Sequence, residues 1–382
     1  MNDTADVQLP LLPRSVAIYM HDLSSGGVER LTLTLADEFS RFGIRTTLLL
    51  HARRGDFLDQ VPEGVEVVAF GTWREIADLP PLMSFLRRAR PDVLLSSLNH
   101  NNIIAVWARL LARVPTRVVV SVHNTLSEEV AALGGWKYRA MPTLYRRFLP
   151  LADSVVAVSQ GVAEDLSKVA RVQLGRISVI HNPILHRNFD ALAAEPVPHR
   201  WLQPGAPRPV FVSVGRLVEQ KDFSTLLRAF SLYRRAHPGR LVVLGRGPLL
   251  DQLQAEAAQL GIQDDVDFAG FSPNPLPYLH AADLFVLSSR YEGFGNVLVE
   301  ALGCGTPVLS TDCPHGPREI LEDGAHGRLV PVGDAAALAA GMEQRGAGPW
   351  TPETLRARAR AFSSDVIARR YLEIFAEAGG TA

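Results

Sequence analysis

The chain has few of the features that mark a specialised class of protein. Its 382 residues include only two cysteines, Cys304 and Cys313, so neither a disulfide framework nor a cysteine-based zinc cluster is expected. No apolar run approaches the roughly 18 residues that span a bilayer, and residues 1–12 do not have the pattern of a signal peptide. The net charge of −1 gives no reason to expect nucleic acid as a partner. These features predict a cytoplasmic protein.

Strand-like runs alternate with amphipathic helical stretches along the whole chain, which predicts parallel sheets with helices on both faces. The length is sufficient for two domains, each with its own core. In the first half the strand-like runs are 16–19, 46–50, 65–70, 93–96, 118–122, 155–158 and 177–180. In the second half they are 210–214, 241–244, 266–268, 284–287, 307–310 and 328–330.

A proline-rich segment divides the two halves. Residues 185–209 contain five prolines, a density that predicts a linker with no regular element. We therefore expect an N-terminal domain over 1–190, a linker over 191–208 and a C-terminal domain over 209–362. A final helix over 363–377 is expected to cross back to the first domain. Ligands of doubly wound sheets bind beyond the carboxyl ends of the strands, so the cleft between the domains is the expected site.

The most informative segment is Tyr291–Glu300, with the sequence YEGFGNVLVE. Its two carboxylates, Glu292 and Glu300, flank a glycine-containing turn and the apolar start of a predicted buried helix. The start of such a helix presents unpaired N–H groups and a partial positive charge, where an anion can bind. Backbone amides can donate to phosphate oxygens, and carboxylates can accept hydrogen bonds from hydroxyl groups. Together these groups suit a phosphorylated, polyhydroxylated ligand.

Two cations follow the first strand of the second half. Arg216 and Lys221 lie in the loop after residues 210–214. Two cations at the carboxyl end of a strand can neutralise a departing diphosphate without a metal ion. The alternative is a pair of solvated loop charges, but their presence in the same half as the two glutamates favours the first interpretation.

Glycine-containing turns follow other strands. Gly26 and Gly27 let the backbone approach a ligand closely, although a tight turn alone would also explain a pair of glycines. The turn at 245–248 lacks the glycine spacing of a dinucleotide fingerprint, so it is either a plain turn or a nucleotide contact. The turn at 270–274 is a candidate wall of a base pocket.

Polar residues follow two strands of the first half. His123 and Asn124 directly follow one strand, and the cluster Asn99–Asn102, which includes His100, follows another. A histidine at the carboxyl end of a strand can bind sugar hydroxyls or transfer a proton. Its alternative role is structural, as a cap on the strand.

Basic and aromatic residues interleave over 134–150, a predicted helix without an acidic residue that includes Trp136, Lys137 and Arg139. The pattern favours a membrane surface or an anionic, lipid-linked acceptor. An amphipathic helix with packed aromatic residues and solvated arginines is the alternative.

Four parts of the sequence together resemble the retaining glycosyltransferases of family 4. They are Gly26–Gly27, His123–Asn124, Gly215–Arg216 with Lys221, and Glu292–Glu300. The resemblance covers nearly the whole chain, and its most specific part is the E-x7-E segment with its GFGN turn. The continuation over 310–320 resembles a bacterial branch that builds surface polysaccharides and lipid-linked glycans and includes N-acetylgalactosamine transferases. The family implies the α/β GT-B fold, with two Rossmann-like, doubly wound parallel-sheet domains facing a cleft.

The resemblance also implies roles for the donor-side residues. Arg216 and Lys221 would bind the diphosphate of a nucleotide sugar, and Glu300 would accept the ribose hydroxyls. Glu292 would bind hydroxyls of the donor sugar, and His123 would lie near its outer hydroxyl. The backbone would contribute through Phe294, Gly295 and Asn296 at the turn and through Gly26 and Gly27 in the first domain. The acceptor-side candidates are Asn99, His100, Asn124, Trp136, Lys137 and Arg139.

The implied activity is the retaining transfer of a hexose or N-acetylhexosamine from a UDP-linked donor to a glycan or lipid-linked acceptor. No cofactor or divalent metal is expected, and the inner face of the cytoplasmic membrane is the expected location of the reaction. Front-side attack is favoured, with the leaving phosphate helping to deprotonate the acceptor. The alternatives are a nucleotide-sugar epimerase or hydrolase of the same fold and a non-catalytic nucleotide-sugar-binding protein. An NAD-dependent dehydrogenase is disfavoured because G-x-G-x-x-G follows neither first strand.

Overall fold

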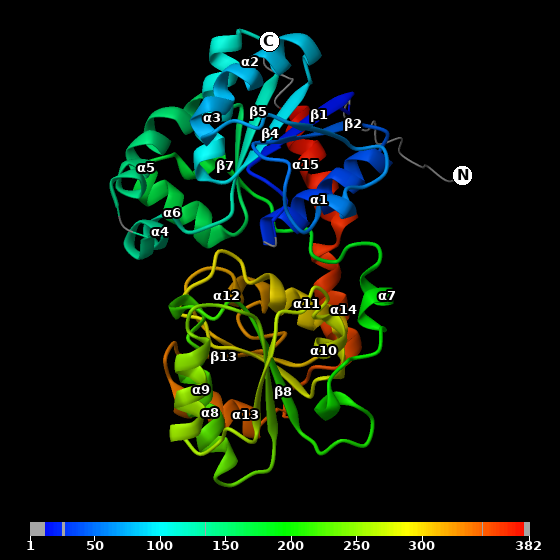
Figure 1. The fold of residues 1–382 in the computed structure, drawn as a ribbon, viewed down its shortest axis with the longest axis vertical. Helices are drawn as coiled ribbons and strands as arrows, with labels where there is room; N and C mark the ends of the chain where they lie inside the picture. Colours follow the sequence, from blue (N-terminus) through cyan, green and yellow to red (C-terminus); the bar gives the residue numbers. More distant parts are fainter. Residues whose placement is uncertain (1–11, 25–26, 134, 346, 378–382) are drawn as a thin grey trace, which may run out of the picture. The chain divides into compact units, whose positions relative to one another are not determined.

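The chain folds into two compact units, each built on its own parallel sheet (Figure 1). The computed structural model describes residues 12–24, 27–133, 135–345 and 347–377. Unit 1 takes in the chain up to Val158, then Val162–Pro183 and the C-terminal helix from Ser364. Unit 2 consists of Ser159–Gly161 and Ile184–Ser363.

In the described part of unit 1, seven parallel strands form a sheet in the order β3-β2-β1-β4-β5-β6-β7. The strands are β1 Ser15–Met20, β2 Arg45–Leu50, β3 Glu66–Ala69, β4 Val93–Ser97, β5 Arg117–Val122, β6 Ser154–Ala157 and β7 Ile177–Val179. The helices are α1 Gly27–Arg41, α2 Leu79–Ala89, α3 Asn99–Ala112, α4 Leu126–Leu133, α5 Gly135–Phe148, α6 Gln160–Ala170 and α15 Ser364–Glu377. Short 3-10 helices are η1 Leu58–Gln60, η2 Glu75–Asp78, η3 Leu149–Leu151 and η4 Leu174–Arg176.

Helices α1 and α15 cover one face of this sheet (Figure 1). Alternate β1 side chains, such as Ile18, belong to the same buried cluster as Phe39 of α1 and Phe375 of α15. The rings of Phe39 and Phe375 lie 5.6 Å apart, and Ser364 Oγ donates to the buried Glu38 Oε1 at 2.7 Å. The last helix of the chain therefore completes the core of unit 1.

Unit 2 repeats the architecture. In its described part six parallel strands run in the order β10-β9-β8-β11-β12-β13. They are β8 Val210–Val214, β9 Arg240–Leu244, β10 Val266–Gly270, β11 Leu284–Leu287, β12 Val308–Thr311 and β13 Arg328–Val330. The helices are α7 Phe189–Ala193, α8 Phe223–Arg234, α9 Leu250–Gln259, α10 Leu276–Ala281, α11 Asn296–Cys304, α12 Pro317–Ile320, α13 Ala335–Glu343 and α14 Pro352–Ala359. The 3-10 helices are η5 Arg200–Leu202, η6 Glu219–Lys221 and η7 Arg360–Phe362.

The structure confirms the predicted fold class, and each predicted strand is present with its ends within two residues of the prediction. Strands buried on both faces have near-continuous apolar sequences, so they can be predicted from the sequence. No helix in the described part of the chain is both long and apolar enough to cross a membrane.

The prediction that 185–209 contains no regular element is wrong. Helix α7 and η5 both lie within it, because Phe189 and Trp201 are apolar anchors that become buried. Phe189 packs closely against Gly303 of α11, where an added Cβ would lie 2.8 Å from its ring. Tertiary burial thus orders a segment whose prolines alone indicate a linker.

We expect Phe375→Ala to destabilise unit 1 by about 3–5 kcal/mol, because it removes a fully buried ring that packs on Phe39. Val366→Ala on the same helix is the matched control, since that side chain is 41% exposed and should change stability by about 0.5 kcal/mol or less. Guanidinium denaturation measures both values. Equal effects of the two substitutions would contradict the role assigned to α15.

Candidate active site

The candidate donor site lies where the strand order of unit 2 reverses. Strands β8 and β11 are neighbours at this point and pair in parallel. The loops that leave their carboxyl ends meet at a topological switch point, the place where doubly wound sheets bind ligands. The loop after β8 carries Arg216 and Lys221, and the loop after β11 carries Glu292.

A largely buried ion pair joins these two loops. Lys221 Nζ donates to Glu292 Oε1 at 2.5 Å, and Ser289 Oγ donates to the same oxygen at 2.6 Å. Glu292 is only 6% exposed. Charge-assisted hydrogen bonds of this kind hold a carboxylate in one orientation. The structure therefore brings together two residues that the sequence analysis had assigned to different parts of the donor.

Further hydrogen bonds fix the backbone around the ion pair. Arg290 N donates to Gln220 O at 2.8 Å, and Gln220 Nε2 donates to Tyr291 O at 3.0 Å. Ser288 Oγ donates to Lys221 O at 2.8 Å. The two loops therefore form one hydrogen-bonded assembly, and the positions of Lys221 and Glu292 depend on each other.

Two glycines with positive φ lie beside this assembly, one at the start of α11 and the other directly before α12. Gly295 is the N-cap residue, with φ +98°, and Gly316 has φ +104°. A Cβ at Gly316 would lie 1.7 Å from Phe294 O, so this position requires glycine. First-turn amides of a helix often lack an intrahelical acceptor, which makes the start of α11 a candidate anion-binding position. Glu300 lies in the second turn of α11 and is half-buried.

Arg216 directly follows Gly215, whose backbone lies very close to that of Gly245. A Cβ at Gly245 would lie 1.8 Å from Gly215 O, and Leu217 N donates to Arg246 O at 3.0 Å. The Arg216 side chain is exposed and forms no hydrogen bond or ion pair with any residue that the structure describes. Arg246 instead lies over the Phe271 ring, 4.4 Å from its centroid. The turn at 245–248 is therefore packed against the Arg216 loop, whereas the Arg246 side chain is engaged elsewhere.

Neither cysteine is activated. Burial, followed by the charge of Glu292, raises the pKa of the Cys313 thiol to about 12. Burial also raises the pKa of Cys304 strongly. Both thiols therefore stay protonated near neutral pH, and thiolate nucleophiles are not available here.

In unit 1 the strand order reverses between β1 and β4, and a cavity of about 250 Å³ lies at this second switch point. Loops and helix starts after β1, β4 and β5 contribute its walls. Four of the predicted residues line it together: Asn99, His100, His123 and Asn124. We call this space the unit 1 cavity.

His123 is uncharged near neutral pH. Burial lowers the pKa of His123 to about 4, although a hydrogen bond with Asn182 opposes the shift. Its Nε2 lies 3.1 Å from Ser121 Oγ. A neutral imidazole can exchange hydrogen bonds with a hydroxyl, and this favours the hydroxyl-binding role over proton donation.

The remaining predicted residues have varied placements. Gly26 lies outside the described residues, and Gly27 is the first residue of α1. Trp136 and Lys137 fall in the first turn of α5, and Arg139 on the same helix is exposed. Tyr145 of this helix is buried and donates to Asn99 Oδ1 at 2.6 Å. One aromatic residue of α5 therefore packs inwards, as the amphipathic interpretation of this helix expects.

Several residues of these sites were not predicted from the sequence, among them Ser289, Glu129 and Asn101. Ser289 precedes Glu292 by only three residues, but nothing in its spacing indicates a bond to that carboxylate. Glu129 accepts hydrogen bonds from Asn99 and, at 2.7 Å, from Asn124. Glu129 lies in a helix, whereas the candidates were predicted from polar residues that directly follow strands, so Glu129 was not among them. Asn101 lies within the predicted cluster Asn99–Asn102, but it was not itself predicted as a site residue.

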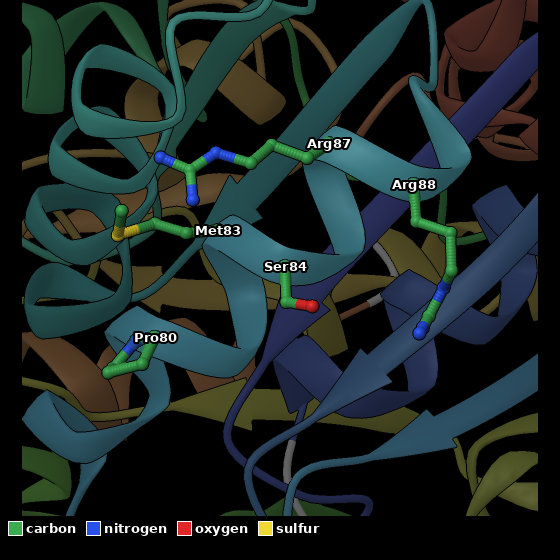
Figure 2. A pocket seen from close by; sticks show the side chains of 5 residues that line it. All are labelled: Pro80, Met83, Ser84, Arg87 and Arg88. Atoms are coloured by element: carbon green, nitrogen blue, oxygen red, sulfur yellow. The ribbon is translucent and has the colours of Figure 1, made fainter.

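A larger hollow, of about 520 Å³, is lined by side chains of α2 (Figure 2). Its lining residues Pro80, Met83, Ser84, Arg87 and Arg88 all come from this one helix. It has no convergent polar groups from other elements and contains no predicted residue. We therefore regard the two switch points as the better candidates, despite the smaller volume of the unit 1 cavity.

Two family models match the chain. The model described as "Glycosyltransferase Family 4" matches residues 25–186, and the model described as "Glycosyl transferases group 1" matches residues 202–362. Together they cover the two halves of the chain that carry the candidate sites.

Curated relatives match over nearly their whole length. The chain is 30% identical to the lipopolysaccharide core biosynthesis glycosyltransferase LpsE of Rhizobium meliloti, over 94% of this chain and 98% of the relative. It is 28% identical to the N-acetylgalactosamine-N,N'-diacetylbacillosaminyl-diphospho-undecaprenol 4-alpha-N-acetylgalactosaminyltransferase of Campylobacter jejuni, over 94% of this chain and 99% of the relative.

Solved structures share the fold at lower identity. The apo form of the lipopolysaccharide outer core galactosyltransferase WaaB superposes with a TM-score of 0.73 at 20% identity, covering 94% of this chain and 98% of WaaB. Anabaena HepE in complex with UDP and glucose superposes with a TM-score of 0.76 at 22% identity and the same coverage. These likenesses support two Rossmann-like domains of the GT-B type.

We expect Lys221→Met to destabilise unit 2 by about 3 kcal/mol, because Glu292 would remain buried without its cation. In the double variant Lys221→Met/Glu292→Gln most of this loss should be recovered, since no buried charge remains. Urea denaturation of the two single variants and the double variant measures the coupling. Simple additivity of the single effects would show that the pair is not coupled.

The low pKa of His123 predicts a pH-dependent stability. Between pH 6.5 and about 4 the unfolded chain protonates this imidazole and the folded protein does not, so stability falls as the pH is lowered through this interval. The loss attributable to His123 is up to about 3 kcal/mol. His123→Gln should remove that component, as measured by urea midpoints at pH 7 and pH 4.5. A pH dependence identical to that of the wild type would contradict the buried, neutral state.

Proposed function

The chain belongs to the glycosyltransferases of family 4, and we propose that it transfers a hexose or N-acetylhexosamine from a UDP-linked donor with retention of configuration. The observation that carries the proposal is the Lys221–Glu292 ion pair beside the start of α11, at the switch point of unit 2. A cation, a carboxylate and helix-start amides at one place are the groups needed to bind a diphosphate attached to a sugar.

Each donor-side residue has a proposed role. Arg216, exposed and without a partner among the described residues, binds the diphosphate together with Lys221. Glu300 accepts hydrogen bonds from the ribose hydroxyls. The backbone amides of Phe294, Gly295 and Asn296 donate hydrogen bonds to the sugar and phosphate. Glu292 accepts hydrogen bonds from hydroxyl groups of the donor sugar. A carboxylate has about four lone-pair sites and can therefore accept several hydrogen bonds at once.

The proposed reaction is a front-side displacement. The bond between the anomeric carbon and the phosphate oxygen breaks while the acceptor oxygen bonds to the same face of the sugar. The acceptor proton passes to the departing phosphate oxygen. Arg216 and Lys221 stabilise the charge that develops on the diphosphate, so we expect transfer without a divalent metal or other cofactor. Glu292 orients the sugar and forms no covalent intermediate.

The proposed acceptor is a growing glycan or a lipid-linked glycan of a surface polysaccharide. LpsE is named for lipopolysaccharide core biosynthesis and the Campylobacter relative for a diphospho-undecaprenol acceptor, and both match over almost their full length. The choice of UDP draws on HepE, whose structure contains UDP.

We also propose that unit 1 works at the inner face of the cytoplasmic membrane. Its surface carries exposed arginines beside apolar side chains on α2, where Arg87 and Arg88 line the hollow with Met83 (Figure 2). Arg139, Arg146 and Arg147 of α5 are exposed as well. Basic side chains near anionic lipids contribute about 1 kcal/mol each to membrane binding.

Lys221→Ala and Glu300→Ala should each lower donor-dependent transfer by roughly two to three orders of magnitude while the protein stays folded, although Lys221→Ala is destabilised in the same way as Lys221→Met. Lys168→Ala is the matched control, because Lys168 is exposed in unit 1 and should leave activity unchanged. The assay supplies a panel of nucleotide sugars with and without acceptor glycans, and product analysis separates transfer from hydrolysis and epimerisation. Wild-type turnover in both site variants would refute the assignment of the donor site.

A further inference from the structure

Three residues between β6 and α6 belong to unit 2, although the chain on both sides of them belongs to unit 1. They are Ser159–Gly161, and we call them the β6–α6 segment. Ser159 is fully buried, and its Oγ donates to Gly293 O at 2.8 Å. Gln160 N donates to Glu319 Oε2 at 3.0 Å. The segment therefore contacts both the loop after β11 and helix α12 within the unit that carries the candidate donor site.

Gly161 lets this segment pack closely on a second loop of unit 2. A Cβ at Gly161 would lie 1.9 Å from Nδ1 of His315, so a larger residue would have to displace that ring. His315 has φ +66° and directly precedes Gly316. Pro314 O of the same loop accepts a hydrogen bond from Glu292 N at 3.1 Å. The β6–α6 segment thus packs on both of the loops that lie beside the start of α11.

The hydrogen bond from Ser159 fixes one peptide group of the candidate donor site. Among the described residues the one cis peptide bond is Arg208–Pro209, so the Gly293–Phe294 peptide is trans and its C=O and N–H point in opposite directions. Holding Gly293 O therefore also sets the direction of the Phe294 N–H. The buried Phe294 ring lies 5.5 Å from the Phe362 ring, centroid to centroid, and this contact anchors its side chain. The Phe294 amide is thus oriented before any ligand binds.

Resting on the proposed function for the identity of the donor, we infer that Ser159 is a positioning residue of the donor site. Its hydroxyl holds the Gly293 carbonyl and so directs the Phe294 N–H toward the sugar and phosphate of the bound donor. A donor group that is oriented in advance stabilises charge without reorganisation during the reaction. The structural alternative is a cap on α6 alone, because Ser159 directly precedes that helix and serine is common at such positions.

The backbone amide NMR resonance of Phe294 in the full chain tests this role without any ligand. Ser159→Gly removes the hydroxyl, and glycine is tolerated as an N-cap, so little capping stability is lost. We expect the Phe294 resonance to shift in this variant and to stay near its wild-type position in Ser159→Thr, which keeps the hydroxyl. Ser167→Gly is the matched control, the same replacement inside α6, and should leave the resonance in place. An unmoved Phe294 resonance in Ser159→Gly would overturn the inference.

Calorimetric titration measures the consequence for donor binding. The probes are UDP, UDP-glucose, UDP-galactose and the UDP-linked N-acetylhexosamines. Ser159→Gly should bind the UDP-sugar that the wild type prefers roughly tenfold more weakly, the effect of one lost hydrogen bond. Ser159→Ala, a second variant without the hydroxyl, should behave in the same way. The control Ser167→Gly should lower the melting temperature slightly and keep the wild-type affinity. Unchanged affinity in both Ser159 variants, or an equal loss in Ser167→Gly, would contradict the positioning role.

The two measurements separate this inference from the proposed function. If the wild type binds none of the UDP compounds while the Phe294 resonance still shifts in Ser159→Gly, the proposed donor is refuted and the hold of Ser159 on the Gly293 carbonyl stands. If the wild type binds and transfers a UDP-sugar while Ser159→Gly alters neither the resonance nor the affinity, the inference alone is wrong.

Discussion

The ion pair between Lys221 and Glu292 is the interaction on which the candidate active site depends. A carboxylate that is only 6% exposed is costly unless it is paired and hydrogen-bonded. Lys221 and Ser289 supply that compensation, and each comes from a loop that follows one of two adjacent strands. The charge therefore holds the two loops together at the switch point. A single buried charge thus links the arrangement of the sheet to the position of the functional groups.

The backbone around this ion pair is as constrained as its side chains. Gly316 and Gly245 each allow a backbone approach that any Cβ would block, one beside Phe294 and the other beside Gly215. Groups fixed in this way need little reorganisation when a ligand binds, which is the condition for effective electrostatic stabilisation. Glycine adopts these positive φ values without strain, and any other residue would clash with the facing backbone.

The sequence predicts the fold well because buried parallel strands have distinctive apolar runs, such as Val210–Val214. The E-x7-E segment likewise marks Glu292 and Glu300 as a unit. Contacts between segments that are distant in the sequence could not be predicted in this way. Glu129 meets Asn99 and Asn124 only because α4 packs near the start of α3, and Phe189 orders α7 only by burial against Gly303. Such contacts depend on tertiary packing, which periodicity and spacing do not encode.

The two switch points differ in electrostatic character, and this difference fits a division of roles. The site in unit 2 joins Arg216 and a helix start, which favour an anion, to the Lys221–Glu292 ion pair, whose two charges offset each other. The unit 1 cavity contains carboxylates and amides, which favour hydroxyl groups and disfavour phosphate. Under the proposed function, Arg216 and the helix start would attract the diphosphate, while the Lys221–Glu292 pair would hold the loops that surround it.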